Sequence, residues 1–471
     1  MSKHKHTRRE FLGRVSMGCA SLGVTSLFSG ITNLGLMNAA AAANRPFIRT
    51  GNEYKALVCI MLSGGNDSSN MLVPRGTSEY AEYAGARGNL ALAQNTLLPI
   101  NPSNITGQEF GLHPSMTQVQ SLFENGNAAF VANVGALVEP TTIAAAQNQT
   151  ISLPLGLFSH SDQRTHWQTG VPQDTSALGW GGKLADILYT NNNNQDISMN
   201  ISLDGVNVFQ RGNIIKEYAI SSQNTGSVLI NGSSSNNFYN TLKRQTLDNI
   251  LDQNYNNILR TAYANTVSDS NGNSFAFSAA IESGPDIMTP FGDDPLSQKL
   301  LMVAKTIAAR GTLDVCNQTF FVESGGWDTH DGLLVDQADL LGTLDAAIGS
   351  FQAAMVELGV QDNVVGFTMS DFGRTLTSNG DGADHGWGGH ALVFGHPVEG
   401  QKIYGQYPEL YLGNSLDLGS GRLIPTTSCD EYFAELALWF GASTGDLNQI
   451  FPNINNFWTP TAGGGPLGIF V

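Results

Sequence analysis

Residues 319–370 read "TFFVESGGWDTHDGLLVDQADLLGTLDAAIGSFQAAMVELGVQDNVVGFTMS", and their pattern decides the fold. The segments 319–324 and 363–370 are short, rich in Val and Phe, and run into Gly or Asp, as buried strands do. Between them a helix is predicted before Gly359, because apolar residues recur at helical spacing. These residues are Leu340, Leu341, Leu344, Ile348, Phe351, Met355 and Leu358. The order strand, helix, strand predicts a βαβ unit.

Similar segments flank this unit on both sides. Further strands are predicted at 54–62, 128–135 and 391–396, because these segments are short and rich in β-branched residues. Further helices are predicted at 295–310 and 430–442, and Ser428 is a suitable N-cap for the second. The alternation predicts an α/β fold with a mostly parallel central sheet flanked by helices.

The composition changes between residues 205 and 290. Asn- and Ser-rich loops surround a polar stretch at 238–266, whose Leu, Ile and Tyr residues recur at helical spacing. An ordered cap of helices and loops, inserted at 205–290, is therefore favoured over a disordered linker. We expect residues 44–471 to form a single α/β domain that carries this insertion.

The N-terminal 43 residues are typical of an export signal. Arg8 and Arg9 precede Phe11 and Leu12, a mildly apolar stretch follows, and small residues lead up to Ala43. This pattern predicts a twin-arginine signal peptide at 1–43, with the twin-arginine translocon as a partner and a periplasmic or extracellular product. Cys19 lacks the preceding residues of a lipid-attachment site. Because the twin-arginine route carries folded proteins, often with a metal bound, a metal site is favoured.

Charge and cysteine content narrow the classes of function. The net charge is −17, and loss of the five basic residues and one Glu of the signal would bring it to −21. Such an acidic surface argues against binding to nucleic acid or to anionic membranes. Cys59, Cys316 and Cys429 are too widely spaced for a disulfide scaffold, and Cys59 and Cys316 are expected to be buried thiols. No apolar stretch of the mature chain approaches transmembrane length, so no stable membrane insertion is expected.

Carboxylates and imidazoles follow several predicted strands. Asp67, Asp328 and Asp371 each come soon after a strand, where ligands bind in open α/β sheets. In an extended segment Asp328 and His330 point the same way. The glycine-rich loop 379–390 adds Asp384, His385 and His390. Such a set can hold a divalent ion, Zn, Mg, Ca or Mn, although a lone Asp or His here is more often a turn, cap or core residue.

Several motifs occur in one order after the signal. They are "GGND" (64–67), "LHPSM" (112–116), "VGALVEP" (134–140), "GWGGKLAD" (179–186), "GGWDTH" (325–330), "SDFGRT" (370–375), "GADHGWGGH" (382–390) and "IPTTSCDEYFAELALWFG" (424–441). This set resembles the bacterial domain-of-unknown-function 1501 family over nearly the whole mature chain. The resemblance implies a place in the alkaline phosphatase/sulfatase superfamily, with a metal-dependent α/β hydrolase fold and a Ser or Thr nucleophile.

The superfamily likeness implies a set of metal ligands. Asp67 resembles its first-strand aspartate, Asp328 and His330 its later pair, Asp371 the next strand-end aspartate, and His385 its late histidine. Two features depart from the superfamily pattern. Phe372 follows Asp371 where a histidine is often found, and the spacing from Asp328 to His330 is shorter than usual. The number of ions is therefore left open.

Two hydroxyls are candidates for the nucleophile. Ser159 lies at a predicted helix start, where backbone N–H groups favour an anionic substrate, but the local pattern slightly favours an N-cap without a chemical role. Thr165 is the rival. Arg374 is suited to hold a phosphate or sulfate, or to pair with a carboxylate. The sequence thus predicts a metal-dependent hydrolase acting on a small or polymeric anionic ester. The alternative is a secreted non-catalytic protein that keeps the fold and a structural metal.

Overall fold

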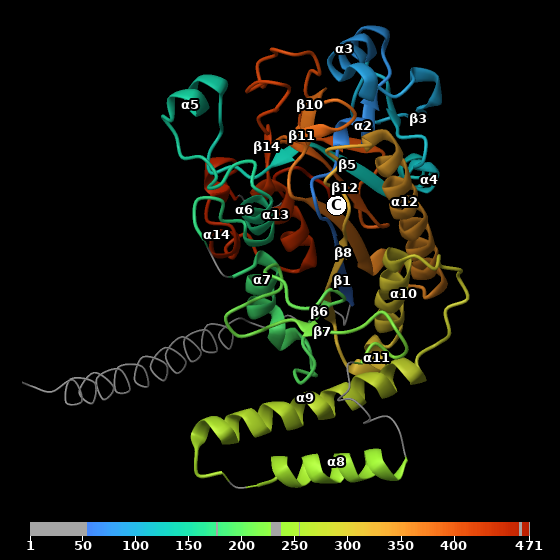
Figure 1. Cartoon of the computed structure of the whole chain (residues 1–471), viewed down its shortest axis with the longest axis vertical. Helices are drawn as coiled ribbons and strands as arrows, with labels where there is room; N and C mark the ends of the chain where they lie inside the picture. The colour runs from blue at the N-terminus through green and yellow to red at the C-terminus, as the bar shows by residue number, and fades with distance from the viewer. Residues whose placement is uncertain (1–53, 176–177, 228–236, 254, 461–463, 471) are drawn as a thin grey trace, which may run out of the picture. The chain divides into compact units, whose positions relative to one another are not determined.

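In the part of the chain that the structure describes, the central sheet has nine strands, which pair in the order β13-β5-β12-β9-β1-β8-β6-β7, with β14 also paired to β5 (Figure 1). The computed structural model describes residues 54–175, 178–227, 237–253, 255–460 and 464–470. The strands of this sheet are β1 (Lys55–Leu62), β5 (Ala128–Gly135), β6 (Asn200–Ser202), β7 (Tyr218–Ala219), β8 (Asn317–Ser324), β9 (Val364–Ser370), β12 (Gly389–Phe394), β13 (Lys402–Tyr404) and β14 (Thr427–Ser428).

Strand direction in this sheet is mostly parallel, as the sequence predicts. β12 runs antiparallel to both β5 and β9, whereas the other pairings in the described sheet are parallel. The predicted βαβ unit is confirmed as β8, α12 (Leu333–Glu357) and β9, and the helix begins seven residues before Leu340, the first of the predicted periodic residues. β1 lies between the two strands of this unit: Ile60 is opposite Val322 on one side and Thr368 on the other.

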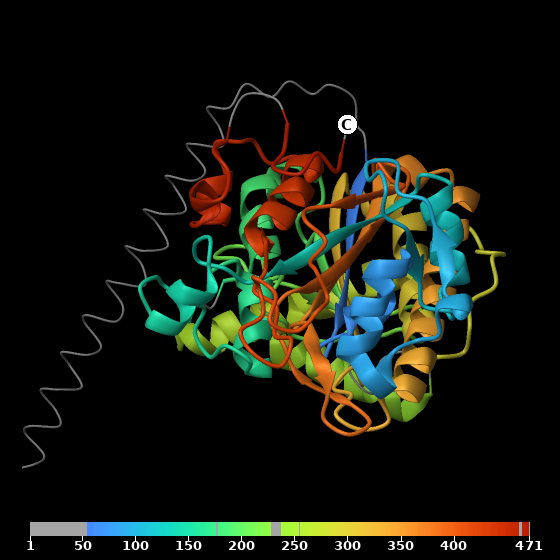
Figure 2. The ribbon, with the colours of Figure 1, turned by 90° about the horizontal axis from the view of Figure 1, so that it is seen from above.

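Alternate residues of β1 pack on opposite faces of the sheet. Val58 and Ile60 join the apolar cluster beneath α10 (Pro295–Ala308) and α12. Cys59 and Met61 join the cluster beneath α7 (Trp180–Leu188) and α13 (Cys429–Phe440). Burying an aliphatic side chain of this size stabilises the fold by roughly 1.5–3 kcal/mol. Because both faces are covered, the strand is continuously apolar rather than alternating. Figures 1 and 2 show these helix pairs on the two sides of the sheet.

The predicted C-terminal helix begins at the predicted cap. The Ser428 hydroxyl accepts a hydrogen bond from the Glu431 N–H at 3.1 Å, and the Glu431 carboxylate accepts one from the Ser428 N–H at 2.8 Å. This reciprocal capping box satisfies two donors that would otherwise lack partners. It fixes the start of α13 at the point where β14 ends.

The remaining elements surround the edges and ends of the sheet. A three-stranded sheet orders β2, β4 and β3, and β10 and β11 form a separate antiparallel hairpin. These elements are α2 (Ser68–Met71), β2 (Leu72–Pro74), α3 (Thr77–Arg87), β3 (Leu98–Ile100), β4 (Phe110–Leu112), α4 (Thr117–Glu124), α5 (Ile143–Asn148), α6 (His160–Thr169), α8 (Phe238–Leu251), α9 (Ile258–Ser283), α11 (Arg310–Leu313), β10 (Arg374–Ser378), β11 (Ala383–His385) and α14 (Leu447–Ile450).

The segment 205–290 contributes the edge strand β7 and the helices α8 and α9. Helices therefore occur where the polar periodic stretch predicts them. In Figure 1 they lie near α11, at the end of the sheet away from β10 and β11. The assignment of 205–290 as an insertion in a single domain stays a prediction.

Three cysteines are free thiols in the part of the chain that the structure describes. Cys59 and Cys429 are buried, and burial raises the pKa of each thiol. Cys316 was expected to be buried, but its side chain is only partly buried. The predicted signal at 1–43, including Cys19, lies outside the described residues. Among the described helices, none combines the length and apolar character that a membrane crossing requires.

Candidate metal centre

The ends of β8 and β9, the start of α6 and the β10–β11 hairpin meet in one place. Two glycines permit this close approach. A Cβ on Gly64, whose φ is +122°, would lie 2.4 Å from the Asp328 backbone nitrogen. A Cβ on Gly382 would lie 2.1 Å from the His330 carbonyl oxygen. Gly64 lies in the loop after β1, and Gly382 lies in the turn between β10 and β11. A larger residue at either position would push that segment away from the loop that holds Asp328 and His330, so both glycines permit the close approach of Asp328, His330 and His385.

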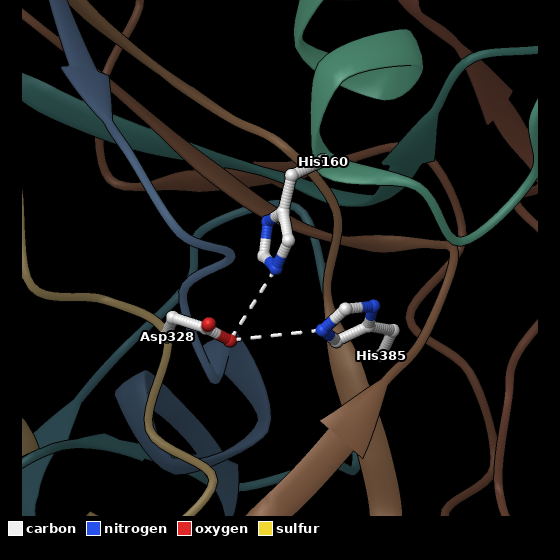
Figure 3. Close-up of side chains that lie close together, drawn as sticks. All are labelled: His160, Asp328 and His385. Carbon is white, nitrogen blue, oxygen red and sulfur yellow. Dashed lines mark ion pairs between the residues drawn. The ribbon is translucent and has the colours of Figure 1, made fainter.

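The Asp328 carboxylate is the point on which the side chains converge (Figure 3). Its Oδ1 lies 3.4 Å from His160 Nε2 and 3.6 Å from His385 Nε2. His330 Nε2 lies 3.1 Å from the same oxygen. Burial alone would raise the Asp328 pKa, but the hydrogen bond and charge of Arg374, with the charges of His160 and His330, lower it. The carboxylate is therefore ionised near neutral pH.

His385 presents an unprotonated nitrogen to this site. Its Nδ1 lies 2.7 Å from the carbonyl oxygen of Phe158, which accepts a hydrogen bond and so fixes the proton on Nδ1. Partial burial, together with the neighbouring charges, lowers the His385 pKa, so the ring is neutral near pH 7. A neutral ring with its proton on Nδ1 has its lone pair on Nε2, which faces Asp328.

His160 is the site residue that sequence reasoning missed. It is the first residue of α6, and its Nδ1 lies 2.8 Å from Asp371 Oδ2. The carboxylate accepts the Nδ1 proton, which leaves Nε2 as the ring nitrogen that faces Asp328. That Nε2 is buried and has no hydrogen-bond partner. The available signal was its position directly after Ser159, at a predicted helix start near the strand ends.

Asp371 lies behind His160 rather than at the centre of the cluster, by which we mean His160, Asp328, His330 and His385. Its Oδ2 accepts hydrogen bonds from His160 and from the Gly64 N–H at 3.2 Å. Burial raises its pKa, and the hydrogen bond and charge of His160 partly offset this effect. The structure therefore brings Asp371 to the site as the group that orients His160.

His330 closes the open side of the cluster. Its Nε2 lies 2.9 Å from His385 Nε2, and its Nδ1 lies 3.5 Å from Asp384 Oδ1. The side chain is 39% exposed, more than that of His160 or His385. Asp328 and His330 thus point into the same site, as their spacing predicts.

Arg374 is fully buried behind Asp328. Its guanidinium donates to Asp328 Oδ1 at 2.5 Å, and to the carbonyl oxygens of Gly64, Gly65 and Ala383 at 2.6–2.9 Å. Of the two roles considered from the sequence, the structure shows the pairing with a carboxylate. These bonds hold Asp328 in place.

Asp67 is not brought into the cluster. Its carboxylate forms an ion pair with Arg87, and both side chains are at most 1% exposed. Arg87 also donates to the Thr375 carbonyl at 3.0 Å. Asp67 was expected to be a metal ligand at the end of a strand. In the structure it is paired instead with Arg87, a buried arginine from α3 that the sequence pattern did not reveal.

The other candidates lie outside the cluster or at its edge. Ser159 is the N-cap residue of α6, but its hydroxyl caps no N–H and lies 3.1 Å from the Ser161 hydroxyl. The Thr165 hydroxyl donates to the Ser161 carbonyl at 2.7 Å, within α6. His390 is buried; its Nδ1 accepts from the Asn133 N–H, and burial lowers its pKa to about 3. It is therefore a neutral core residue.

His160, Asp328 and His385 fit a metal ion. Their donor atoms lie within 4.8 Å of one another, and they are the only such group of three among the described residues. Ligands bound at 2.0–2.2 Å in tetrahedral geometry are about 3.3–3.6 Å apart. The separations of 3.4 and 3.6 Å from Asp328 fall in this range, whereas the two histidine donors lie within 4.8 Å of each other. Each donor also has an orienting partner (Asp371, Arg374 or the Phe158 carbonyl), as metal ligands typically do.

Comparisons with solved structures find remote similarity. The chain matches a PsFucS1 sulfatase from Pseudoalteromonas sp. with a TM-score of 0.35 at 10% identity, covering 88% of this chain and 74% of that one. It matches the soluble domain of lipooligosaccharide phosphoethanolamine transferase A from Neisseria meningitidis with a TM-score of 0.33 at 9% identity, covering 83% and 89%. The lipoteichoic acid synthase LtaP from Listeria monocytogenes matches with a TM-score of 0.31 at 9% identity, covering 80% and 77%.

Comparison with curated proteins finds no match. One protein family does match: the profile of "Protein of unknown function (DUF1501)" covers residues 54–417, which include β1, the β8–α12–β9 unit and His160, Asp328 and His385. The chain therefore belongs to the DUF1501 family.

Proposed function

We propose that this protein is a metal-dependent hydrolase of phosphate or sulfate esters, with its ion held by His160, Asp328 and His385. The observation that carries the proposal is the buried Nε2 of His160, which has no hydrogen-bond partner and faces the Asp328 carboxylate at 3.4 Å, beside the unprotonated Nε2 of His385. An unpartnered buried nitrogen costs free energy, which a bound cation would recover.

The donor set selects among the ions considered. Mg²⁺ and Ca²⁺ prefer sites built entirely from oxygen atoms. Two or three imidazoles with one carboxylate suit Zn²⁺, and also Mn²⁺. We therefore propose Zn²⁺ first and Mn²⁺ second, with His330 as a further ligand because its Nε2 is 3.1 Å from Asp328.

The residues around the cluster suit an anionic ester. A bound divalent ion would polarise an ester oxygen and lower the pKa of a coordinated water. Asp371 holds the Nδ1 proton of His160, and Arg374 holds Asp328, so neither side chain needs to reorganise when charge develops. The N-terminus of α6 lies at the cluster, and its helix dipole favours negative charge there.

Ser159 is the proposed nucleophile, because it precedes His160 and its hydroxyl is not used as a cap. We expect Ser159→Ala to lower kcat by at least about 100-fold with metal content unchanged, as loss of a nucleophile does. Ser161→Ala, which removes the neighbouring hydroxyl, is the matched control and is expected to retain activity. Equal kcat in both variants and the wild type would assign the attack to water instead.

One observation favours the alternative of a non-catalytic protein with a structural metal. The Ser159 hydroxyl has Ser161 as its neighbour rather than a base. The two functions are separated by purifying the mature protein, loading it with Zn²⁺ or Mn²⁺, and assaying generic aryl phosphates and sulfates. Metal-dependent release of the aryl alcohol supports the hydrolase. A metal-loaded protein that hydrolyses neither class supports the structural role.

His330→Ala is expected to lower the affinity for the ion and to reduce the metal content after dialysis. The stability of the variant should fall relative to wild type and be partly restored by added metal, because an ion bound only to the folded state stabilises it by mass action. Elemental analysis and thermal unfolding measure both effects. If His330 belongs only to a polar turn, the stability changes by less than about 0.5 kcal/mol and metal content stays constant.

We also propose export through the twin-arginine translocon to the periplasm or beyond, on the grounds of Arg8 and Arg9 and the small residues before Ala43. Replacing both arginines with lysine is expected to leave the precursor in the cytoplasm, because the translocon reads the arginine pair. Cell fractionation and immunoblotting measure the distribution. An unchanged periplasmic yield would contradict this route.

A further inference from the structure

A cavity of about 590 Å³ opens beside the metal cluster, and His330, Asp384 and His385 form part of its wall. Its volume suits a small organic molecule rather than a single ion. Because two of the cluster histidines line it, a molecule in this cavity would lie next to the ion. The other residues of the wall therefore indicate which chemical groups the substrate carries.

Apart from Gln147 and one arginine, the rest of the wall is apolar. Leu153, Leu157 and Phe158 line it, and they pack against the small buried cluster of Leu137, Trp387 and Ile424. Leu418 and Ala146 of α5 extend the same surface. These side chains offer no hydrogen bonds to the many hydroxyls of a sugar. An aromatic ring or an alkyl chain, in contrast, would bury apolar surface against them.

One cationic side chain, Arg422, joins this wall. Its Nε donates to the His385 carbonyl at 3.0 Å, its Nη1 donates to the Gly419 carbonyl at 3.4 Å, and its guanidinium lies over the Phe158 ring at 5.6 Å. Among the described residues, Nη2 has no hydrogen bond to protein. These contacts hold a positive charge between the apolar wall and the histidines, where an ester's anionic group would lie.

We propose that the substrate is a phosphate or sulfate monoester of an apolar alcohol, aryl or alkyl. This inference rests on the proposed hydrolase function and narrows its substrate. The apolar alcohol portion occupies the Leu153–Leu157–Phe158 wall, and the anionic ester group lies between Arg422 and the ion. Hydrolysis breaks the bond between the ester oxygen and phosphorus or sulfur, water supplies the new oxygen, and the alcohol oxygen takes a proton.

The first test compares two phosphate monoesters of primary alcohols on the metal-loaded protein, 2-(2-naphthyl)ethyl phosphate and glycerol 1-phosphate, because their leaving groups are alike and only one carries a large apolar group. We expect kcat/KM to be at least about tenfold higher for the naphthyl ester, from buried apolar area. Leu157→Asn should raise KM for the naphthyl ester alone by roughly tenfold. Leu155→Asn is the matched control, because Leu155 is 44% exposed and does not line the cavity. Preference for the glycerol ester would overturn the proposal.

The second test needs no turnover and therefore separates the two proposals. Naphthalene-2-sulfonate, which is not an ester, should bind the metal-loaded wild type, and Leu157→Asn and Arg422→Gln should each weaken binding by roughly tenfold. Arg422→Lys should recover part of the loss. If the sulfonate binds in this way but no ester is hydrolysed, the hydrolase function fails and the ligand class stands. Equal dissociation constants for wild type, Leu157→Asn and Arg422→Gln would refute the cavity assignment.

Discussion

Replacing His160 with alanine is expected to remove the bound ion and lower kcat/KM by more than about 100-fold. Loss of an orienting partner alone typically costs 10- to 100-fold in metal affinity or activity, and a direct ligand is expected to cost more. The physical reason is that the Nε2 of His160 is aimed at Asp328 with no other partner. Metal content after dialysis and steady-state kinetics measure the two effects.

The matched control is His396→Ala. Like His160, His396 is 34% exposed and lies near a carboxylate, with its Nδ1 3.3 Å from Asp362 Oδ1. This ion pair of His396 involves no residue of the cluster. We expect this variant to keep its metal and its activity. A His160→Ala protein that retains a full complement of ion would show that the ion lies elsewhere.

The second large effect concerns stability. Arg87→Met is expected to destabilise the fold by about 3–5 kcal/mol, because it leaves the Asp67 carboxylate buried without its counter-charge. The double variant Asp67→Leu/Arg87→Met should recover much of this loss, since it removes both charges together. Urea unfolding of the two variants measures the difference.

A change in the Asp67–Arg87 ion pair also tests the expected role of Asp67 as a metal ligand. If Asp67 serves the Arg87 ion pair and not the ion, then Asp67→Asn lowers stability but leaves metal content at the wild-type value. If the Asp67→Asn protein remains folded but loses its metal, the original prediction that Asp67 is a metal ligand would be supported.

The fold could be predicted from the sequence because its signals are local. The strands near 54–62, 319–324 and 363–370 are continuous apolar runs, and the helix between the last two carries a long apolar stripe ended by Gly359. The order of strands in the sheet is not local. The insertion of β1 between β8 and β9 depends on packing between segments more than 250 residues apart in sequence.

Part of the candidate site could be anticipated for the same reason. Asp328, His330, Asp371 and His385 follow strands or lie in one glycine-rich loop, and parallel strands bring such positions to one edge. His160 could not be anticipated in this way. It comes from α6, and its placement depends on the hydrogen bond to Asp371, 211 residues away.

Arginines account for the remaining differences between expectation and structure. Arg87 comes from α3 and forms an ion pair with the carboxylate of Asp67. Arg374 donates to the backbone carbonyls of Gly64, Gly65, Trp327 and Ala383, which lie in three separate segments of the chain. A buried arginine satisfies several acceptors at once, and the sequence does not show which ones. The distinction between a substrate-binding and a positioning arginine therefore required the structure.

The most direct test of the metal centre is anomalous diffraction from crystals of the mature protein grown with Zn²⁺, measured on both sides of the zinc absorption edge. We predict one strong peak between His160 Nε2, Asp328 Oδ1 and His385 Nε2, at about 2.0–2.2 Å from each. A strong peak at Asp67 and Arg87, or no peak near the three donors in a crystal that contains zinc, would contradict the central claim.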